Sequence, residues 1–516
     1  MKISSLVIAA ALAVSCAAGP RTTECVNPLN YTDTPDPDVV RVGEDYYLVT
    51  TTMYYHPIAP IMHSRDLVHW RIVSYVCEDL GDDDFYTFAD GKNAYGCGQW
   101  ATSLQYKDGW WYALFITNEQ HKTYIYRTDD VLRSGWEKVA VLDEFFHDAS
   151  LLLDTDGRNY VVYGNSELYL TELESDLSGV KAGGTDCLIV DFDRTGSALG
   201  AEGTRFYHIG DWYYLFEIDW PEGGIRTERV WRSRSITGPY ESRIVCDGTI
   251  GGRTDGVAQG PIVQTQSGDW YGLFFQDHGA VGRILTVQPL TWEDGWPVAG
   301  EGGKPLEKVD VKLAPFGDNY LWADDEFESG TLPLVWQWNH KPLEGCWSLS
   351  ERPGWLRLRT GQVASGIADA RGTLTQRTAG PVCISEVRLD ASGLKDGDFA
   401  GICALQSNRC SIGLAREGGE LLLKAVSESP SGSLTVLRQP WEGGEILLRL
   451  RYDFTCDLAY MSWSADGSEW NDAGFAQEMS FTLDYFTGYR TGLFCYSTLE
   501  TGGHADFDYF RQRVEN

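Results

Sequence analysis

Basic residues are scarce in this chain of 516 residues, where 42 lysines and arginines stand against 74 aspartates and glutamates. The formal net charge is −32, and a surface of that sign repels phosphate backbones and acidic membranes. The composition therefore argues against a nucleic-acid-binding protein. It also disfavours an acidic polysaccharide as a substrate, because such a polymer carries charge of the same sign.

Long apolar runs are missing except near the N-terminus, where Leu6 to Val14 form a run of nine. That run is too short to span a bilayer but fits an export signal. The small residues before Cys16 resemble a bacterial lipoprotein cleavage site, although Ala13 stands where leucine is usual. We expect residues 1–20 to be a signal peptide with lipidation at Cys16, which would make the chain an exported lipoprotein of the bacterial cell envelope, in the periplasm or at the outer membrane. Membrane contact would then go through this anchor alone; a plain signal peptide cleaved nearby is the alternative.

Cysteine spacing typical of metal sites is also absent. None of the twelve cysteines forms a CxxC pair, and no cluster of cysteine and histidine has zinc-ligand spacing. If Cys16 is lipidated, eleven cysteines remain, so they cannot all pair internally. We expect most of them to be small buried residues.

Helical periodicity is rare, whereas 56 glycines and 13% aromatic residues are typical of a mostly β protein. A turn containing glycine, followed by aromatic residues and an apolar run, recurs five times. Repeats of about 50 residues with several strands each predict a β-propeller, here with five blades over about residues 27–315. The five segments are "VGEDYYLVT" (42–50), "YKDGWWYALF" (106–115), "DTDGRNYVVYG" (154–164), "HIGDWYYLFE" (208–217) and "TQSGDWYGLFF" (265–275), anchored on Tyr47, Tyr112, Tyr160, Tyr214 and Tyr271.

One position recurs eleven or twelve residues before each anchor tyrosine. If the first strand of each blade lines the channel, these positions form a ring around one mouth of the propeller. Three carboxylic acids in one ring repel each other when ionised, so at least one pKa should rise. Glycoside hydrolysis requires paired carboxylic acids of unequal pKa. Each acid taken alone could instead be a turn former, a cap or a solvated side chain. The ring holds Asp36, Trp100, Asp148, Glu202 and Gln259.

From about residue 322 to 514 the blade pattern stops. Short runs such as "GWLRLRT", "ISEVRLDA" and "EILLRLRYD" alternate apolar and polar residues between turns, which predicts a β-sandwich of the jelly-roll, concanavalin A-like kind. The chain is therefore expected to be all-β, with a five-bladed propeller followed by a sandwich.

Three quoted stretches resemble the family 43 glycoside hydrolases, five-bladed propellers that cleave pentose linkages with inversion. "PDPDVVRVGEDYYLVT" is similar to the first blade, which implies Asp36 as the general base. "FHDASLLLDTDGRNYVVYG" is similar to the segment of the aspartate that orients the acid and modulates its pKa, which implies Asp148. "LGAEGTRFYHIGDWYYLFE" is similar to the segment of the general acid, which implies Glu202. The C-terminal part resembles the concanavalin A-like domain of β-xylosidase-type members, and in some relatives a loop of it closes one side of the active site.

The chain departs from this family at two places. Ala258 stands where many relatives carry a histidine that helps hold a central cation, which makes that cation doubtful, although His278 could substitute for the missing ligand. Asp148 is followed by Ala149 instead of proline, which argues against the related sucrose-cleaving propellers.

Substrate contacts are expected from four residues. Trp100 would stack on a sugar or merely pack, Tyr55 would line the rim, and Gln259 belongs to the ring. Arg283 matches an arginine near the terminal sugar in relatives and could donate to hydroxyls through its fork, or form a salt bridge to one of the acids.

Asp325 and Asp506 are candidate calcium ligands of the second domain, with plain surface carboxylates as the default interpretation. The acid–base chemistry itself requires no cofactor. We expect an exo-acting, inverting hydrolase that releases xylose or arabinose from hemicellulose oligosaccharides of the plant cell wall. The alternative is a lipid-anchored propeller that binds sugars without turnover; the oligomeric state is left open.

Overall fold

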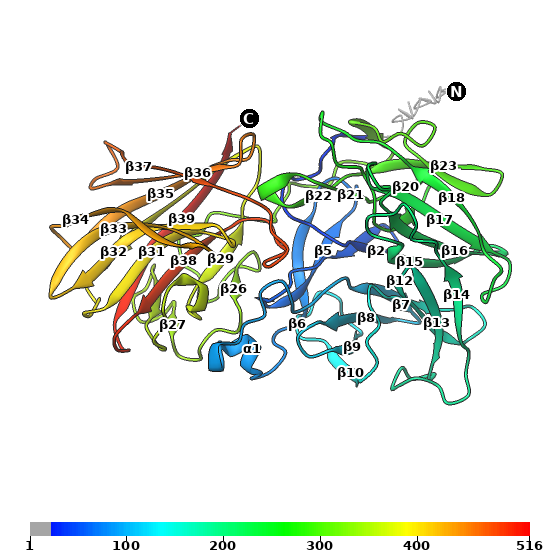
Figure 1. The fold of residues 1–516 in the computed structure, drawn as a ribbon, viewed down its shortest axis with the longest axis horizontal. Helices are drawn as coiled ribbons and strands as arrows, with labels where there is room; N and C mark the ends of the chain where they lie inside the picture. The colour runs from blue at the N-terminus through cyan, green and yellow to red at the C-terminus, as the bar shows by residue number, and fades with distance from the viewer. Residues whose placement is uncertain (1–21, 516) are drawn as a thin grey trace, which may run out of the picture.

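Five four-stranded antiparallel sheets form the first part of residues 22–515, the range that the computed structural model describes, as Figure 1 shows in blue to green. The predicted five-bladed propeller is thereby confirmed. The first three blades are β2 (Asp38–Val42), β3 (Asp45–Val49), β5 (Ile58–Ser64) and β6 (Arg71–Cys77); β7 (Ser103–Lys107), β8 (Trp110–Thr117), β9 (Lys122–Thr128) and β10 (Glu137–Leu142); and β11 (Ser150–Leu153), β12 (Asn159–Asn165), β13 (Glu167–Leu173) and β14 (Asp186–Asp191). The last two are β15 (Glu202–Ile209), β16 (Trp212–Asp219), β17 (Thr227–Ser233) and β18 (Glu241–Cys246); and β19 (Ile262–Gln264), β20 (Trp270–Gly272), β23 (Gln288–Glu293) and β24 (Trp296–Ala299).

The recurring aromatic runs are the second strands of the blades. Each turn before them contains a glycine with a positive φ, a conformation that favours glycine and joins two antiparallel strands tightly. The anchor tyrosines lie on β3, β8, β12, β16 and β20 and are buried or half-buried between blades. The turn glycines are Gly43, Gly109, Gly157, Gly210 and Gly268.

The first strands of the blades are the innermost ones. β2 contacts β7, β7 contacts β11, β11 contacts β15, and β19 contacts β2, while the fourth and fifth blades meet through β18 and β24. Near the ends of the propeller, β1 (Thr23–Val26) pairs with β25 (Lys308–Val311), and β21 (Phe275–Asp277) pairs with β22 (Arg283–Leu285). Residues at the start of the innermost strands therefore surround one mouth of the channel.

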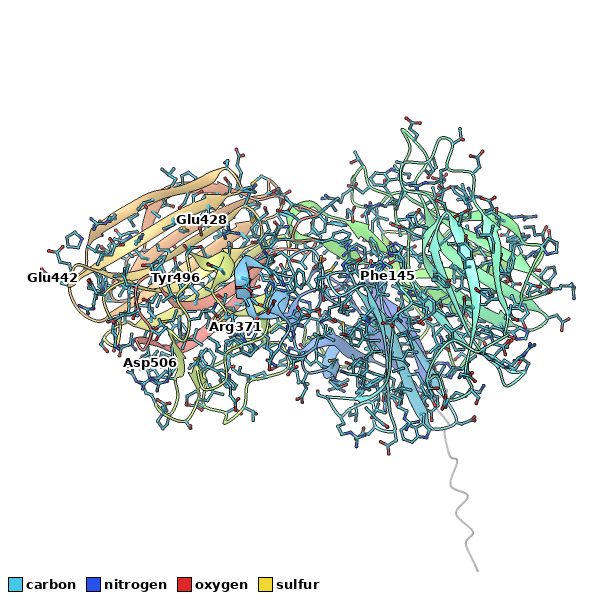
Figure 2. The ribbon with its side chains drawn as sticks, turned by 60° about the horizontal axis from the view of Figure 1, so that its bottom comes forward. Phe145, Arg371, Glu428, Glu442, Tyr496 and Asp506 are labelled. Carbon is cyan, nitrogen blue, oxygen red and sulfur yellow. The ribbon has the colours of Figure 1, made fainter. Side chains whose placement is uncertain are left out.

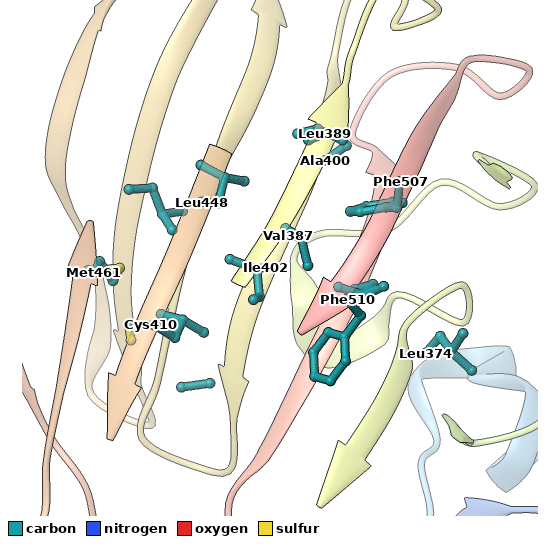
Figure 3. Close-up of a cluster of buried hydrophobic side chains, with 14 of the residues drawn as sticks. Leu374, Val387, Leu389, Ala400, Ile402, Cys410, Leu448, Met461, Phe507 and Phe510 are labelled. Carbon is teal, nitrogen blue, oxygen red and sulfur yellow. The ribbon is translucent and has the colours of Figure 1, made fainter. Parts of the chain in front are cut away.

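The second part of the chain is a two-sheet sandwich, drawn in yellow to red in Figure 1. Figure 3 shows its core, where Leu448, Val387 and Phe507 of one sheet face Ile402 and Cys410 of the other. One sheet has the order β34 (Gly432–Pro440), β33 (Glu420–Ser429), β32 (Arg409–Glu417), β31 (Asp398–Leu405), β38 (Arg490–Ser497), β29 (Leu374–Arg377), β26 (Gln337–Asn339) and β4 (Tyr55–His56). The other has the order β27 (Trp347–Ser348), β28 (Leu356–Arg359), β39 (His504–Glu515), β30 (Val382–Asp390), β35 (Glu445–Asp453), β36 (Leu458–Ser464) and β37 (Asn471–Glu478).

The two domains share a strand and a core. β4 leaves the first blade and pairs with β26, so that the propeller supplies the last strand of a sandwich sheet. A second hydrophobic cluster joins propeller residues such as Phe115 to sandwich residues such as Phe494. A loop of the sandwich can therefore be held in a fixed place over the propeller.

Helical structure in the described range is limited to short turns. These are α1 (Asp84–Thr87) and the 3-10 turns at Ala89–Gly91, Gly279–Val281 and Ile367–Asp369. Between residues 22 and 515, no helix has the length and apolar character needed to cross a bilayer. The expected signal peptide and Cys16 lie outside the described residues.

Candidate active site

The five ring positions all lie at the start of an innermost strand. Glu202 begins β15, and the other members of the ring stand two or three residues before β2, β7, β11 and β19. Gln259 Nε2 donates to Asp36 Oδ1 over 3.2 Å, and the backbone amide of Gly203 donates to Asp148 Oδ2 over 3.1 Å. A Cβ atom at Gly203 would come within 2.7 Å of the Gln259 side chain. Contacts therefore run continuously around the mouth from Asp36 to the two acids on the other side.

Asp36 is 6% exposed and is held by two donors on the same oxygen. Arg283 Nη1 lies 2.8 Å from Asp36 Oδ1, which also accepts the amide of Gln259. Among the described residues no side-chain hydrogen bond reaches the other oxygen, Oδ2. That arrangement leaves Oδ2 free to accept a hydrogen bond from a water molecule. The salt bridge foreseen for Arg283 is present.

The opposite side of the mouth carries a cluster of three titratable groups. His147 Nε2 lies 3.3 Å from Glu202 Oε2 and 4.0 Å from Asp148 Oδ2. The negative charge of Asp148 is the largest cause that raises the pKa of His147 to about 9, against burial and with help from Glu202. Burial raises the pKa of Asp148, the positive charge of His147 opposes that rise, and the charge of Glu202 adds to it. The expected rise of a carboxyl pKa is therefore present, with desolvation as its larger cause.

Three ring members adopt a backbone conformation that is uncommon outside glycine. Asp36, Asp148 and Gln259 have φ values of 50°, 47° and 60°. Left-handed residues cost conformational energy and persist only where surrounding contacts impose them, which is common at functional sites. At Asp36 that contact is Arg205 on β15, whose Nη2 donates to the carbonyl oxygens of Asp36 and Pro37 over 2.9 and 2.7 Å.

Aromatic residues wall the site from both domains. Phe486, in the sandwich loop between β37 and β38, lies with its ring centre 5.5 Å from that of Trp100. The guanidinium of Arg283 lies 4.5 Å from the same Phe486 ring. Trp100 in turn lies 5.9 Å from the ring of His147, so the predicted position of Trp100 beside the acids agrees with the structure.

Sequence reasoning missed four residues of this site. His147 immediately precedes Asp148 in the quoted "FHDAS" stretch, so its position was a usable signal. Asn165 donates to Glu202 Oε2, and Arg205 donates to the carbonyl oxygen of Asp36. Each of these contacts joins two different blades, and the sequence pattern does not reveal which side chains of different blades meet. Phe486 is separated from Arg283 by about 200 residues and reaches the site only because the domains pack together.

The expectation that Tyr55 lines the rim is wrong. Tyr55 is fully buried on β4, where it pairs with Asn339 in the sandwich sheet, and the guanidinium of Arg490 lies 3.8 Å from its ring. The segment after β3 leaves the blade to join the other domain, so its aromatic side chain fills the domain interface.

The three candidate metal ligands do not converge on a cation. Asp506 accepts hydrogen bonds from the guanidinium groups of Arg357 and Arg352 over 2.7 to 3.0 Å. Burial favours the neutral form of Asp506, but these hydrogen bonds outweigh it and hold the pKa of Asp506 below its ordinary value. Asp506 lies on the sandwich half in Figure 2, far from Phe145 on the propeller. Asp325 accepts the Trp336 indole and the Phe327 amide.

His278 belongs to no group of three converging candidate ligands in the described part of the chain. Its Nε2 lies 2.9 Å from Gln276 Oε1, and burial together with the charge of Arg253 lowers its pKa to about 3. In the described part of the chain, the one group of three or more converging histidine, cysteine or acidic side chains is His147, Asp148 and Glu202. The charge of Asp148 raises the pKa of His147 to about 9, so a cation would have to compete with a proton at this group.

Comparisons with known proteins agree with this geometry. The family model "Glycosyl hydrolases family 43" matches residues 25–297, and the model "Beta xylosidase C-terminal Concanavalin A-like domain" matches residues 324–513. A beta-xylosidase of Formosa agariphila is 28% identical over 94% of this chain and 89% of its own length. A non-reducing end alpha-L-arabinofuranosidase of Bacteroides ovatus is 26% identical over 94% of each chain. The solved structure of a bifunctional GH43-CE protein of Bacteroides eggerthii superposes with a TM-score of 0.91 at 39% identity, covering 96% of this chain, which spans 64% of that protein.

Proposed function

Because the chain belongs to family 43 of the glycosyl hydrolases, we propose that it is an exo-acting enzyme that releases terminal xylose or arabinose from hemicellulose oligosaccharides. Family 43 enzymes hydrolyse glycosides with inversion at the anomeric carbon. The observation that carries the proposal is the meeting of Asp36 with Asp148 and Glu202 at one mouth of the propeller. Relatives named for both sugars support the choice of substrate class without separating the two.

In the proposed reaction, Asp36 removes a proton from a water molecule whose oxygen attacks the anomeric carbon. The bond from that carbon to the leaving oxygen breaks on the opposite face, and Glu202 gives its proton to the departing oxygen. Asp148 orients the acid side through Gly203 and carries the charge that balances His147. Inversion requires the two catalytic carboxyls to stand roughly 6.5–9.5 Å apart, which leaves room for the water.

Chain-end cleavage is supported by the wall that Phe486 and Trp100 form beside Arg283. A site closed on one side accepts the end of a chain and resists a polymer that continues through it. The guanidinium of Arg283 donates to Asp36 and lies over the Phe486 ring. From this position it can hold the base in place and donate hydrogen bonds to the terminal sugar.

The proposal includes no cofactor, because proton transfer by two carboxyls completes the hydrolysis. It also includes export and an anchor at Cys16, which lies outside the described residues. Labelling of the expressed protein with radioactive palmitate, with Cys16→Ser as the control, tests the anchor.

The deciding experiment compares wild type with Glu202→Gln and Asp36→Asn on nitrophenyl β-xyloside, nitrophenyl α-arabinofuranoside and xylobiose. Loss of a general acid or base should lower kcat on xylobiose by about 10²–10⁴-fold. NMR of the first product should show the inverted anomer. A wild type that binds xylan fragments but hydrolyses none of these substrates would instead support the sugar-binding propeller without turnover.

A further inference from the structure

Two side chains donate to a single oxygen of Glu202. Asn165, the last residue of β12, and His147 both contact Oε2, the latter over 3.3 Å. The amide of Asn165 is oriented by Ser166, whose hydroxyl donates to Asn165 Oδ1 over 3.0 Å. The NH₂ group of Asn165 therefore faces Glu202 and can only donate.

The oxygen Oε1 of Glu202 has no hydrogen-bond partner among residues 22–515. A protonated carboxyl has one hydroxyl oxygen and one carbonyl oxygen, and an oxygen that accepts two hydrogen bonds is the carbonyl one. We propose that Asn165 and His147 are positioning residues that place the acidic proton of Glu202 on Oε1, the oxygen left open to the glycosidic bond. The inference rests on the proposed function, in which Glu202 protonates the leaving group.

The charges around His147 are consistent with this role. His147 faces Asp148 and Glu202 directly, Asp36 acts on it from across the mouth, and Trp100 lies beside its ring. The negative charge of Asp148 is the largest contributor to the raised pKa of His147, so Nε2 carries a hydrogen at neutral pH. Since Asp148 balances the imidazolium, His147 can donate to Glu202 without leaving a net charge in the cluster.

The predicted signature is a dependence on the leaving group. Departure of a sugar hydroxyl needs protonation, whereas dinitrophenolate leaves without it, so a misplaced proton should harm only the first reaction. Asn165→Leu and His147→Ala should lower kcat/KM on xylobiose by about 10²-fold while activity on 2,4-dinitrophenyl β-xyloside falls by no more than about threefold. In a Glu202→Gln background, Asn165→Leu should bring no further loss, because no proton remains to be placed.

Matched controls come from the same blades. Asn159→Leu changes the same residue type at the other end of β12, where the amide binds the carbonyls of Glu174 and Ser175. His208→Ala removes a histidine paired with Asp154 over 2.6 Å. Both controls remove a part-buried polar contact without touching Glu202, so neither should change the ratio between the two substrates.

Equal losses on xylobiose and the dinitrophenyl substrate in a variant that unfolds at the wild-type temperature, or wild-type rates on both, would overturn the inference while leaving the hydrolase proposal intact. A wild type inert on both substrates would refute the proposed function instead. Thermal unfolding of each variant identifies general loss of folded protein, which lowers both rates together and leaves their ratio unchanged.

Discussion

Arg205 links the strand of the proposed acid to the loop of the proposed base. It lies on β15, three residues after Glu202, and its side chain is 2% exposed. Nε and Nη2 donate to the Pro37 carbonyl over 2.9 and 2.7 Å, and Nη2 also reaches the Asp36 carbonyl over 2.9 Å. The guanidinium therefore holds Asp36 in its left-handed conformation and sets its position relative to Glu202.

Arg205→Met keeps much of the volume and removes every donor. The carbonyls of Asp36 and Pro37 then lose their partner, and each unpaired buried polar group costs about 1–3 kcal/mol, so about 2–6 kcal/mol is expected for the two. Asp38, whose Oδ1 lies 3.7 Å from the Arg205 guanidinium, also loses a positive neighbour, and burial already raises the pKa of Asp38. The total is a large part of the 5–15 kcal/mol that usually stabilises a folded domain.

The effect on catalysis follows from geometry. A displacement of the base by about 1 Å typically costs on the order of 10²-fold in rate, so kcat on nitrophenyl xyloside should fall by that factor while KM changes little. The assay measures kcat and KM well below the unfolding temperature, together with the urea midpoint. Arg229→Met, which removes a pair with Asp219 on the same blade, is the control that should lower stability and leave kcat near wild type.

Two outcomes would contradict this reasoning. Wild-type stability in Arg205→Met would show that the two carbonyls do not depend on the guanidinium. A lower urea midpoint with unchanged kcat would show that Arg205 supports the fold but does not position Asp36.

Two further predictions concern the wall and the acid cluster. Phe486→Ala removes a ring 4.5 Å from the Arg283 guanidinium. A cation–π contact of about 0.5–2 kcal/mol corresponds to a 2- to 30-fold lower kcat/KM on xylobiose. Chromatography of xylohexaose digests should also show new internal cleavage, whereas release of single sugars alone would argue against the wall. His147 has a folded-state pKa of about 9 against an ordinary 6.5, so its stabilisation is complete below pH 6.5 and is lost as the pH rises towards 9. Urea unfolding should show a decrease of up to about 3 kcal/mol across that range, and a slope that persists in His147→Gln would refute the assignment.

The repeat pattern was sufficient to predict the propeller and the register of its ring. Alternating side chains, glycine turns and aromatic second strands are local properties, and they recur in each blade because every blade packs against its neighbours in the same way. Counting back twelve residues from Tyr160 and Tyr214 therefore places Asp148 and Glu202 in the ring. The alternating runs after residue 322 likewise predicted the sandwich.

Tertiary structure decided which other side chains share the mouth. Phe486 meets Arg283, and β4 carries Tyr55 away from the site, because the sandwich packs on the propeller and takes up one of its strands. Asn165 reaches Glu202 only through the packing of neighbouring blades. Contacts of this kind join residues far apart in the chain through domain and blade packing, for which a local pattern of apolar and polar residues contains no signal.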